Sequence, residues 1–305
     1  MLPTRNGSLH LFRLAGIDVY LHWTWFVVAI YMVQAPARLF GSLAWGVLEY
    51  LALFLIVLMH EFGHALACRQ TGGTANQIVL WPLGGVAYVA PPPRPGAVLW
   101  SIAAGPLVNL ALEPLLSLLV FLSHSAGWAD TLPNLYLYIK IVWLINTFLF
   151  LFNLVPVYPL DGGQILRALL WFVFGRARSL MIASGIGLAG TAAFLLLAVW
   201  MHSVWFGILS VFVLLNCWQG WVASRAMVRI AEAPRRHEYA CPKCRTAPPI
   251  GAFWGCVRCR VAFDMFAAPG VCPHCGTAYA GSACFECGAG APFSAWATLS
   301  ILNKG

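Results

Sequence analysis

The sequence contains a short motif whose residue types and spacing suit metal chemistry. It reads His60-Glu61-Phe62-Gly63-His64, with the two histidines four positions apart. On a helix such a pair projects from one face and can bind a single metal ion. Glu61 stands beside the pair, where a carboxylate can take a proton from a metal-bound water. The spacing therefore predicts a metal-dependent hydrolytic site.

A catalytic zinc site uses three protein ligands and keeps one position open for water. The strongest third ligand is Asp161, an acidic residue in the otherwise apolar stretch 153–163. An alternative role for Asp161 is a helix N-cap after Pro156 and Pro159, because Asp is favoured at that position. Four other candidates fit less well, namely Glu49, Glu113, His22 and His124.

A second group of candidate ligands lies near the carboxyl end. Eight of the ten cysteines form Cys-x-x-Cys pairs there: Cys241/Cys244, Cys256/Cys259, Cys272/Cys275 and Cys284/Cys287. Thiolate quartets of this type make closed tetrahedral zinc sites. We expect two structural zinc ions, with pairing inside each half of the segment favoured and crossed pairing left open. A segment this small should need the metal to fold.

The composition shows where these groups must sit. Of 305 residues, 61% are hydrophobic and 9% charged, and the mean hydropathy is +0.78. These values exclude a water-soluble globular enzyme for most of the chain. A membrane-spanning helix needs about 20 apolar residues. Six stretches qualify, at roughly 19–36, 43–68, 97–123, 135–156, 180–200 and 203–223.

The basic residues indicate how these spans are oriented. With the amino terminus in the cytoplasm, only Arg38 and Lys140 of the 18 Lys and Arg residues fall outside. This bias follows the positive-inside rule and predicts that both termini are cytoplasmic. Residues 1–19 lack the apolar core and cleavage site of a signal peptide.

Two apolar stretches do not fit simple spans. Residues 76–90 are too short to cross, rich in β-formers, and contain Gly84-Gly85, which suits a hairpin turn. We expect a re-entrant β-hairpin there, with a cytoplasmic amphipathic loop as the alternative. Residues 157–174 follow Pro156 and Pro159, so a short, partly buried helix should resume after that break.

These motifs together resemble the site-2 protease family of intramembrane zinc metalloproteases. The resemblance lies in HEFGH at 60–64 and the LDGG segment at 160–163. Further matching segments are GPLVN at 105–109, PLGG at 82–85 and GIDVYLHWTWF at 16–26. The resemblance covers about residues 8–225. The expected fold is a polytopic α-helical membrane protein with about six transmembrane helices, a re-entrant β-hairpin and a small cytoplasmic zinc-ribbon domain, in a prokaryotic cell membrane.

The resemblance also implies roles for single residues. His60, His64 and Asp161 would hold zinc, and Glu61 would activate water. Asn153 would help to bind the carbonyl oxygen of the scissile peptide. A buried Asn109 or Asn146 could supply the same contact, although hydrogen bonding between helices is the commoner reason for such residues.

Substrate would bind at the predicted hairpin. An exposed strand edge within residues 76–90 can capture an unwound segment by strand addition. The residues expected to bind substrate are Leu83, Gly84, Gly85 and Asn109.

We therefore expect a zinc endopeptidase, with one catalytic and two structural zinc ions, that cuts transmembrane segments of other proteins near the cytoplasmic face. The expected parts are a metalloprotease domain (1–230), a linker (231–240), a cytoplasmic double zinc ribbon (241–290) and a C-terminal tail (291–305). For the ribbons, a cytoplasmic protein partner or substrate gating is favoured over nucleic acid and over a purely structural cap. Apart from substrates, the expected partner of the first domain is the lipid bilayer.

Two other function classes compete with this interpretation. A metal transporter could use His60, Glu61, His64 and Asp161 as a translocation site, with the ribbons as sensors. Transporters show ligands along a path through several spans and often internal repeats, whereas this sequence shows one cluster and no repeat. A silent membrane scaffold for the ribbons is disfavoured by the intact Glu61.

Overall fold

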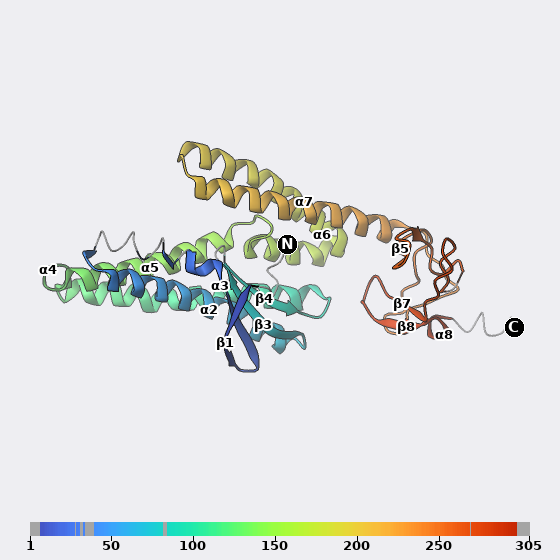
Figure 1. Cartoon of the computed structure of the whole chain (residues 1–305), viewed down its shortest axis with the longest axis horizontal. Helices are drawn as coiled ribbons and strands as arrows, with labels where there is room; N and C mark the ends of the chain where they lie inside the picture. The colour runs from blue at the N-terminus through green and yellow to red at the C-terminus, as the bar shows by residue number, and fades with distance from the viewer. Residues whose placement is uncertain are drawn as a thin grey trace. The chain divides into compact units, whose positions relative to one another are not determined.

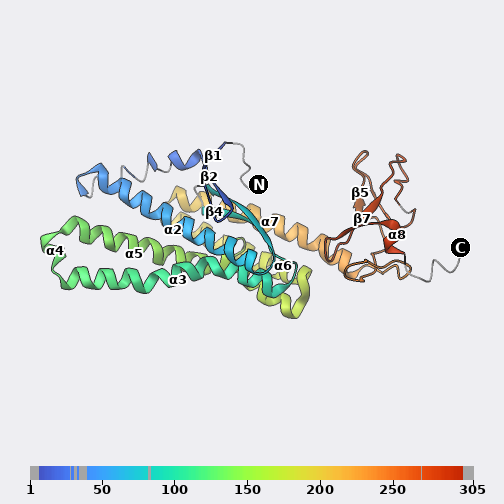
Figure 2. The same ribbon diagram turned by 90° about the horizontal axis from the view of Figure 1, so that it is seen from below.

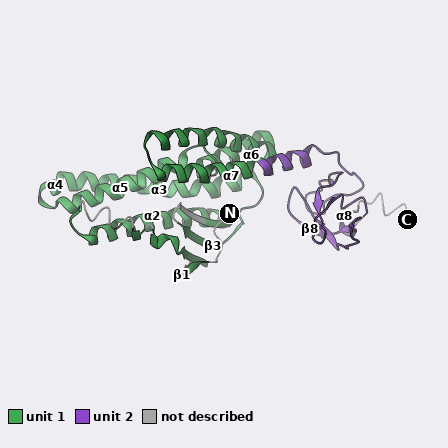
Figure 3. Cartoon of the chain, turned by 45° about the horizontal axis from the view of Figure 1, so that its top comes forward, with its two compact units in different colours: residues 1–221 green, residues 222–305 purple. Residues whose placement is uncertain are grey.

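The computed structural model describes residues 7–27, 29–30, 33, 40–81, 84–268 and 270–297 (Figure 1). The chain divides into two compact units, residues 1–221 and 222–305 (Figure 3). The first unit is mainly helical and contains one four-stranded sheet. The second unit contains short strands joined by loops. The division falls within the last long helix, and the expected boundary at residue 230 stays a prediction.

Five helices among the described residues are long and apolar enough to cross a membrane. They are α2 (Leu43–Gln70), α3 (Pro95–Ser125), α5 (Pro133–Leu154), α6 (Asp161–Trp200) and α7 (Val204–Glu232). Within α6 the backbone at Gly175 is non-helical, so a short stretch from Asp161 precedes a longer one. The expected short helix after the prolines and five of the six expected spans therefore coincide with helices.

The expectation of a span at 19–36 is partly wrong. Residues 19–22 belong to strand β2 (Ile17–His22), and helical backbone follows at 24–27 and 29–30. Most of 31–39 lies outside the described residues. In β2, Ile17, Val19 and Leu21 are buried and alternate with more exposed residues. This period of two is the signature of a strand, which a criterion based only on apolar length overlooks.

Strand β2 is part of a sheet with the order β1-β2-β3-β4, whose other strands are β1 (Ser8–Leu14), β3 (Thr74–Trp81) and β4 (Gly84–Ala90). β2 and β3 pair in parallel and both outer pairs are antiparallel. Helix α2 makes the crossover that a parallel pair requires. Its residues Val57 and Ala65 share one apolar core with Val19 and Ile78 of the sheet.

Strands β3 and β4 form an antiparallel pair within the stretch predicted to be a hairpin, while its re-entrant position in a membrane stays a prediction. Trp81 of β3 pairs with Gly84, and Leu80 pairs with Gly85. The two glycines, which suited a turn, are therefore paired residues at the start of strand β4, and residues 82–83 lie outside the described residues. Strand β4 forms one edge of the four-stranded sheet.

Arg69 joins the end of α2 to the sheet. Its Nε donates to the backbone oxygen of Ala75 at 2.8 Å, and its terminal nitrogens donate to the backbone oxygens of Ala15 and Gly16. A weaker bond reaches Oδ1 of Asn76 at 3.3 Å. One guanidinium group thus fixes the β1–β2 turn and the start of β3 relative to the helix that carries the HEFGH motif.

Helices α3 and α5 lie side by side and are joined through the short helix α4 (Trp128–Thr131) (Figure 2). Large apolar side chains on both helices are exposed, among them Leu118, Phe121, Phe148 and Leu151. A helix that is apolar on its outer face as well as its inner one suits a lipid environment. Helix α2 approaches α3 at Gly63, where a Cβ would lie 2.7 Å from the backbone oxygen of Ala104.

The second unit contains two small antiparallel hairpins. They are β5 (Trp254–Gly255) with β6 (Ala262–Phe263), and β7 (Gly281–Ala283) with β8 (Gly290–Pro292), followed by the short helix α8 (Phe293–Trp296). Phe263, Met265, Phe266 and Trp296 form the core together with buried cysteines. The segment before the first cysteine pairs with the end of the unit, because Tyr239 bridges to Ala297.

The Arg69 contacts lead to a stability prediction. Arg69→Met keeps the apolar stem but removes all four hydrogen bonds, and should destabilise the first unit by about 2 kcal/mol, since hydrogen bonds to charged groups contribute about 1.5–3 kcal/mol each and partial exposure weakens them. Thermal melts in detergent check this. Arg225→Met, at an exposed position on α7, is the matched control, and equal melting temperatures for the two variants would contradict the role of Arg69.

Candidate active site and metal centres

Three candidate ligand atoms converge in the first unit. Nε2 of His60 lies 3.0 Å from Nε2 of His64 and 3.0 Å from Oδ2 of Asp161, and the His64–Asp161 distance is 3.3 Å. The side chains are 8%, 7% and 13% exposed in the order His60, His64, Asp161. Tetrahedral ligands at about 2.0–2.1 Å from zinc stand about 3.3 Å apart. The sequence-predicted ligands therefore have the spacing of a zinc site.

The hydrogen bonds of the two histidines show that this donor set fits a cation. Nδ1 of His64 donates to the backbone oxygen of Ser101 at 2.9 Å, and Nδ1 of His60 donates to Oδ1 of Asn109 at 2.6 Å. With its hydrogen on Nδ1, a neutral imidazole has a bare lone pair at Nε2. Two lone pairs and a carboxylate oxygen then face one another, an arrangement that a positive ion stabilises.

Gly105 of α3 provides the space for this cluster. A Cβ built at this position would meet the imidazole of His64 and would lie 2.7 Å from Nε2 of His60. The backbone of α3 therefore approaches the two metal-facing nitrogens more closely than any side chain allows. This feature belongs to the GPLVN segment, but the sequence alone did not indicate its steric role.

Asp161 reaches the site because a tight loop follows α5. Helix α5 ends at Leu154, and Asp161 is the first residue of α6. The N-cap is Leu160, and no side chain caps the helix. The alternative role of Asp161 as an N-cap is therefore wrong. Gly162 and Gly163 are required by close packing, since a Cβ on either would collide with the loop backbone between Leu154 and Tyr158.

Glu61 lies between the metal ligands and the edge of the sheet. It is 5% exposed, and its Oε2 accepts the backbone N–H of Ala87 in strand β4 at 2.8 Å. The candidate general base is thus held by the same strand edge that was expected to bind substrate. Ala87 was not among the predicted site residues, because its contact depends on how the sheet packs against α2.

The other predicted residues occupy different positions. Asn153 is partly buried near the end of α5, and its side chain has no hydrogen-bond partner among the described residues. Asn109 and Asn146 bond to each other across α3 and α5, the inter-helix role that was the commoner explanation. Gly84 and Gly85 lie in β4, whereas Leu83 is outside the described residues.

The weaker ligand candidates do not join the cluster. His22 pairs with Oγ1 of Thr24, His124 lies against Tyr136, and Glu113 accepts hydrogen bonds on α3. Glu49 is buried on α2. Among the described residues of the first unit, the candidate ligand atoms that all lie within 4.8 Å of one another come from His60, His64 and Asp161.

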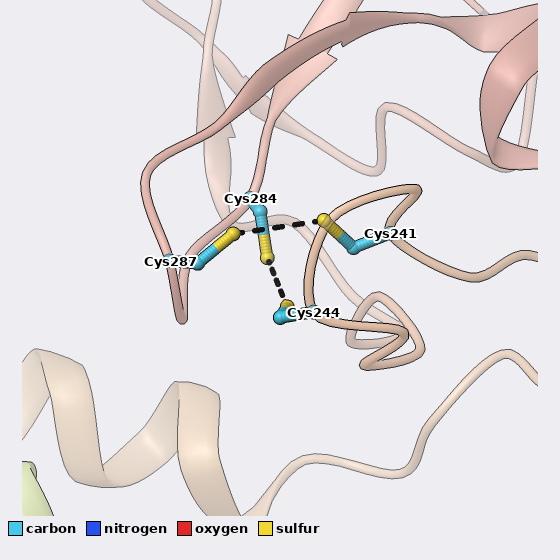
Figure 4. Close-up of side chains that lie close together, drawn as sticks. All are labelled: Cys241, Cys244, Cys284 and Cys287. Carbon is cyan, nitrogen blue, oxygen red and sulfur yellow. Dashed lines mark hydrogen bonds between the residues drawn. The ribbon is translucent and has the colours of Figure 1, made fainter.

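The tail cysteines form two quartets, and their pairing corrects the favoured expectation. One quartet contains Cys241, Cys244, Cys284 and Cys287, whose sulfurs point toward one another (Figure 4). The other contains Cys256, Cys259, Cys272 and Cys275. Sulfur–sulfur distances of 3.5 to 3.8 Å join the pairs. Zinc–sulfur bonds of about 2.3 Å place tetrahedral thiolates about 3.8 Å apart, so both quartets fit zinc.

The arrangement is nested, because the four cysteines of the second quartet lie in the sequence between the two Cys-x-x-Cys pairs of the first quartet. Its physical cause is the pairing of the ends of the unit, where the backbone N–H of Ala240 donates to the oxygen of Trp296. This contact brings the first and last Cys-x-x-Cys pairs together. At Cys256, a hydrogen bond from the backbone N–H of Cys259 lowers the pKa of the thiol to about 5. The lowered pKa favours the thiolate, the form that binds zinc.

The position of Gly105 leads to a prediction about metal binding. Gly105→Ala should remove zinc from the first unit while the fold persists, because the added methyl group occupies the space beside both Nε2 atoms. Zinc analysis of the purified chain and a thermal melt check the two parts. Gly96→Ala on the same helix is the control, since a Cβ there meets its nearest atom at 3.9 Å. Full zinc content in Gly105→Ala would refute the steric argument.

The nested pairing predicts a distinctive result for double variants. Cys259→Ser with Cys272→Ser affects one quartet and should lower the zinc content by one ion. Cys244→Ser with Cys272→Ser affects both quartets and should lower it by two. If the cysteines paired within each half of the tail instead, Cys259 and Cys272 would belong to different quartets, and their double variant would lose two ions. Elemental analysis of the purified chains distinguishes the two arrangements.

Known proteins share this sequence pattern. The model of peptidase family M50 matches residues 49–136 and 124–199. A zinc metalloprotease of Methanocaldococcus jannaschii is 35% identical over 182 residues, which are 60% of this chain and 51% of that protein. A putative zinc metalloprotease of Bacillus subtilis is 32% identical over 155 residues, which are 41% of this chain and 70% of that protein. The chain spans about half the length of the first of these relatives.

A solved structure agrees with the sequence matches. The site-2 protease from Methanocaldococcus jannaschii superposes with a TM-score of 0.51 and 28% identity. The match covers 70% of this chain and 95% of that one. The matched family segment contains His60, Glu61, His64 and Asp161. The chain therefore belongs to peptidase family M50, the site-2 protease family.

Proposed function

We propose that this protein is an intramembrane zinc endopeptidase that hydrolyses peptide bonds in transmembrane segments near the cytoplasmic face. One observation carries the proposal: His60, His64 and Asp161 converge beside Glu61 within a bundle of helices apolar enough to span a membrane. Ionisable groups at such depth are costly and usually functional. Family membership supports the same reaction class.

The chain's own groups would divide the chemistry as follows. Zinc, when bound by His60, His64 and Asp161, supplies a Lewis acid that polarises a carbonyl group and lowers the pKa of water to about 7. Glu61 takes one proton from the attacking water, whose oxygen forms the new bond to the carbonyl carbon. The carbon–nitrogen bond then breaks as Glu61 returns the proton to the amine nitrogen.

The developing negative charge on the carbonyl oxygen needs a preorganised donor. We assign this role to the side-chain amide of Asn153. Its lack of a hydrogen-bond partner among the described residues supports the assignment, since an unengaged amide is available to substrate. Asn109 and Asn146 are less suitable, because both amides are engaged with each other.

Substrate would bind by adding a strand to the edge of β4. A transmembrane helix hides its carbonyl groups in backbone hydrogen bonds, so it must unwind before hydrolysis. An edge strand offers unpaired backbone groups to such a segment. The contact between Glu61 and Ala87 supports this binding site, since it links the strand edge directly to the general base. Gly84 and Gly85 belong to the same strand, and Leu83 precedes it.

We place both termini in the cytoplasm on the basis of the charge asymmetry, and we propose a prokaryotic cell membrane as the location. The tail would hold two structural zinc ions in its nested quartets. Its proposed role is to contact a cytoplasmic protein or to control substrate access, rather than to bind nucleic acid. A transporter remains the less favoured alternative, because the ligand groups described in the first unit form one cluster rather than a path.

The decisive test is Glu61→Gln. This variant should keep its zinc and lose cleavage by about 10²–10⁴-fold or more, because it removes the general base without removing a ligand. Cleavage of a purified transmembrane segment in detergent measures the loss, and proteomics of membrane fragments released only by wild type would identify native substrates. Glu49→Gln, which changes another buried acidic residue of α2, is the control. Near-normal cleavage by Glu61→Gln would falsify the mechanism.

A further inference from the structure

A chain of hydrogen bonds leads from His60 into the neighbouring helices. Nδ1 of His60 contacts Oδ1 of Asn109 on α3 at 2.6 Å, and Nδ2 of Asn109 donates to Oδ1 of Asn146 on α5 at 2.9 Å. Nδ2 of Asn146 donates onward to Oε2 of Glu113 at 2.9 Å. Both asparagines are fully buried. Helices α3 and α5, which carry this series of hydrogen bonds, lie side by side (Figure 2).

Only one orientation of the two amides fits these contacts. Nδ2 of Asn146 also lies 3.0 Å from the backbone oxygen of Asn109, so its amino group faces two acceptors. Its Oδ1 must then face Nδ2 of Asn109, and Oδ1 of Asn109 must face His60. An oxygen at that position requires a hydrogen on Nδ1 of His60. Nε2 of His60 is thereby left bare toward Asp161 and His64.

Glu113 ends the chain in a pocket of donors. Besides Asn146, its oxygens lie 2.7 Å from Nε1 of Trp143 and 3.1 Å from Oγ1 of Thr147. The indole N–H of Trp143 can only donate, and it faces Oε1, while the amino group of Asn146 faces Oε2. Both oxygens of Glu113 must therefore act as acceptors. An acidic residue in an apolar span is costly and calls for a functional reason. No role for Glu113 follows from the proposed reaction steps themselves.

We propose that Glu113 is a positioning residue that acts through Asn146 and Asn109 on His60. Together with the backbone oxygen of Asn109, it fixes the direction of the hydrogen bonds in this relay from Glu113 to His60, and so keeps the His60 hydrogen on Nδ1 and the ring oriented for metal. The inference rests on the proposed function, because it assigns His60 to the metal. Outer partners of metal-binding histidines generally set the tautomer and the ring orientation in this way.

The first test measures zinc binding by the full-length protein in detergent, with free zinc set by a chelator. The zinc-binding step that is lost in His60→Ala belongs to the site in the first unit. Zinc binding by the tail sites serves as an internal reference. Glu113→Gln should weaken that step by about 10–100-fold, the usual effect of losing an outer partner. A glutamine has one oxygen and cannot accept from both Asn146 and Trp143. Glu49→Gln, outside the relay, should leave the step unchanged.

A polarity swap separates positioning from mere packing. Asn146→Asp places an oxygen against Glu113 and against the backbone oxygen of Asn109, and should weaken the same zinc step at least as much as Glu113→Gln. In the double variant Asn146→Asp/Glu113→Gln the glutamine amino group donates to the new carboxylate, which restores a donor–acceptor pair at that contact, while the contact with the backbone oxygen of Asn109 stays unfavourable. Zinc binding in the double variant should therefore be tighter than in Asn146→Asp alone. Additive losses in the double variant would overturn the relay.

The last measurement reads the tautomer directly. In metal-free, full-length protein with ¹⁵N-labelled histidine, His60 should show a protonated Nδ1 in wild type and Glu49→Gln, and a mixture of tautomers in Glu113→Gln. An unchanged tautomer together with unchanged zinc affinity in Glu113→Gln would refute the proposal. Absence of any zinc step that depends on His60 would overturn the proposed function instead. The tautomer measurement would still decide the relay, because it requires no metal.

Discussion

Three hydrogen-bond acceptors held within 3.3 Å of one another are the constraint on which the first unit depends. Two imidazole lone pairs and a carboxylate oxygen repel each other unless a cation lies between them, so the fold must hold them together. Three helices share that task. Helix α2 supplies both histidines at the spacing of one turn, α6 begins at Asp161, and α3 accepts or orients the outer hydrogen of each ring through Ser101 and Asn109.

Close approach of backbones makes this convergence possible. Gly63 lets α2 approach α3, Gly105 leaves room beside the ring nitrogens, and Gly162 lets the loop after α5 turn back against the start of α6. Small residues serve the same purpose at helix contacts within membranes, where apolar burial drives association little. Arg69 adds a separate constraint, because it fixes the sheet against α2 and so brings Ala87 to Glu61. The site therefore depends on contacts spread across most of the unit.

The sequence predicted what is local and missed what depends on packing. His60 and His64 could be placed because helical geometry alone puts them on one face, and Asp161 because few acidic residues interrupt the apolar stretches. The strand from Ile17 to His22 begins an apolar stretch long enough to resemble a membrane span, and only its period of two distinguishes it from a helix. The bond from His60 to Asn109 on α3, the bond from Asn109 to Asn146 on α5, and the cysteine quartets could not be derived. Every Cys-x-x-Cys pair looks the same whether the pairs are nested or consecutive, and only the contact between the ends of the tail decides.

Nesting gives the tail an order of assembly. The inner quartet joins Cys259 to Cys272, 13 positions apart, whereas the outer quartet joins Cys244 to Cys284, 40 positions apart. Loop-closure entropy grows with the logarithm of loop length, so the outer loop costs about 1 kcal/mol more to close in a free chain. Once the inner quartet holds a metal, the chain between the outer pairs is effectively shorter and that difference shrinks. The tail is therefore expected to mature from its centre outward, with the inner ion acting as a folding nucleus for the outer one.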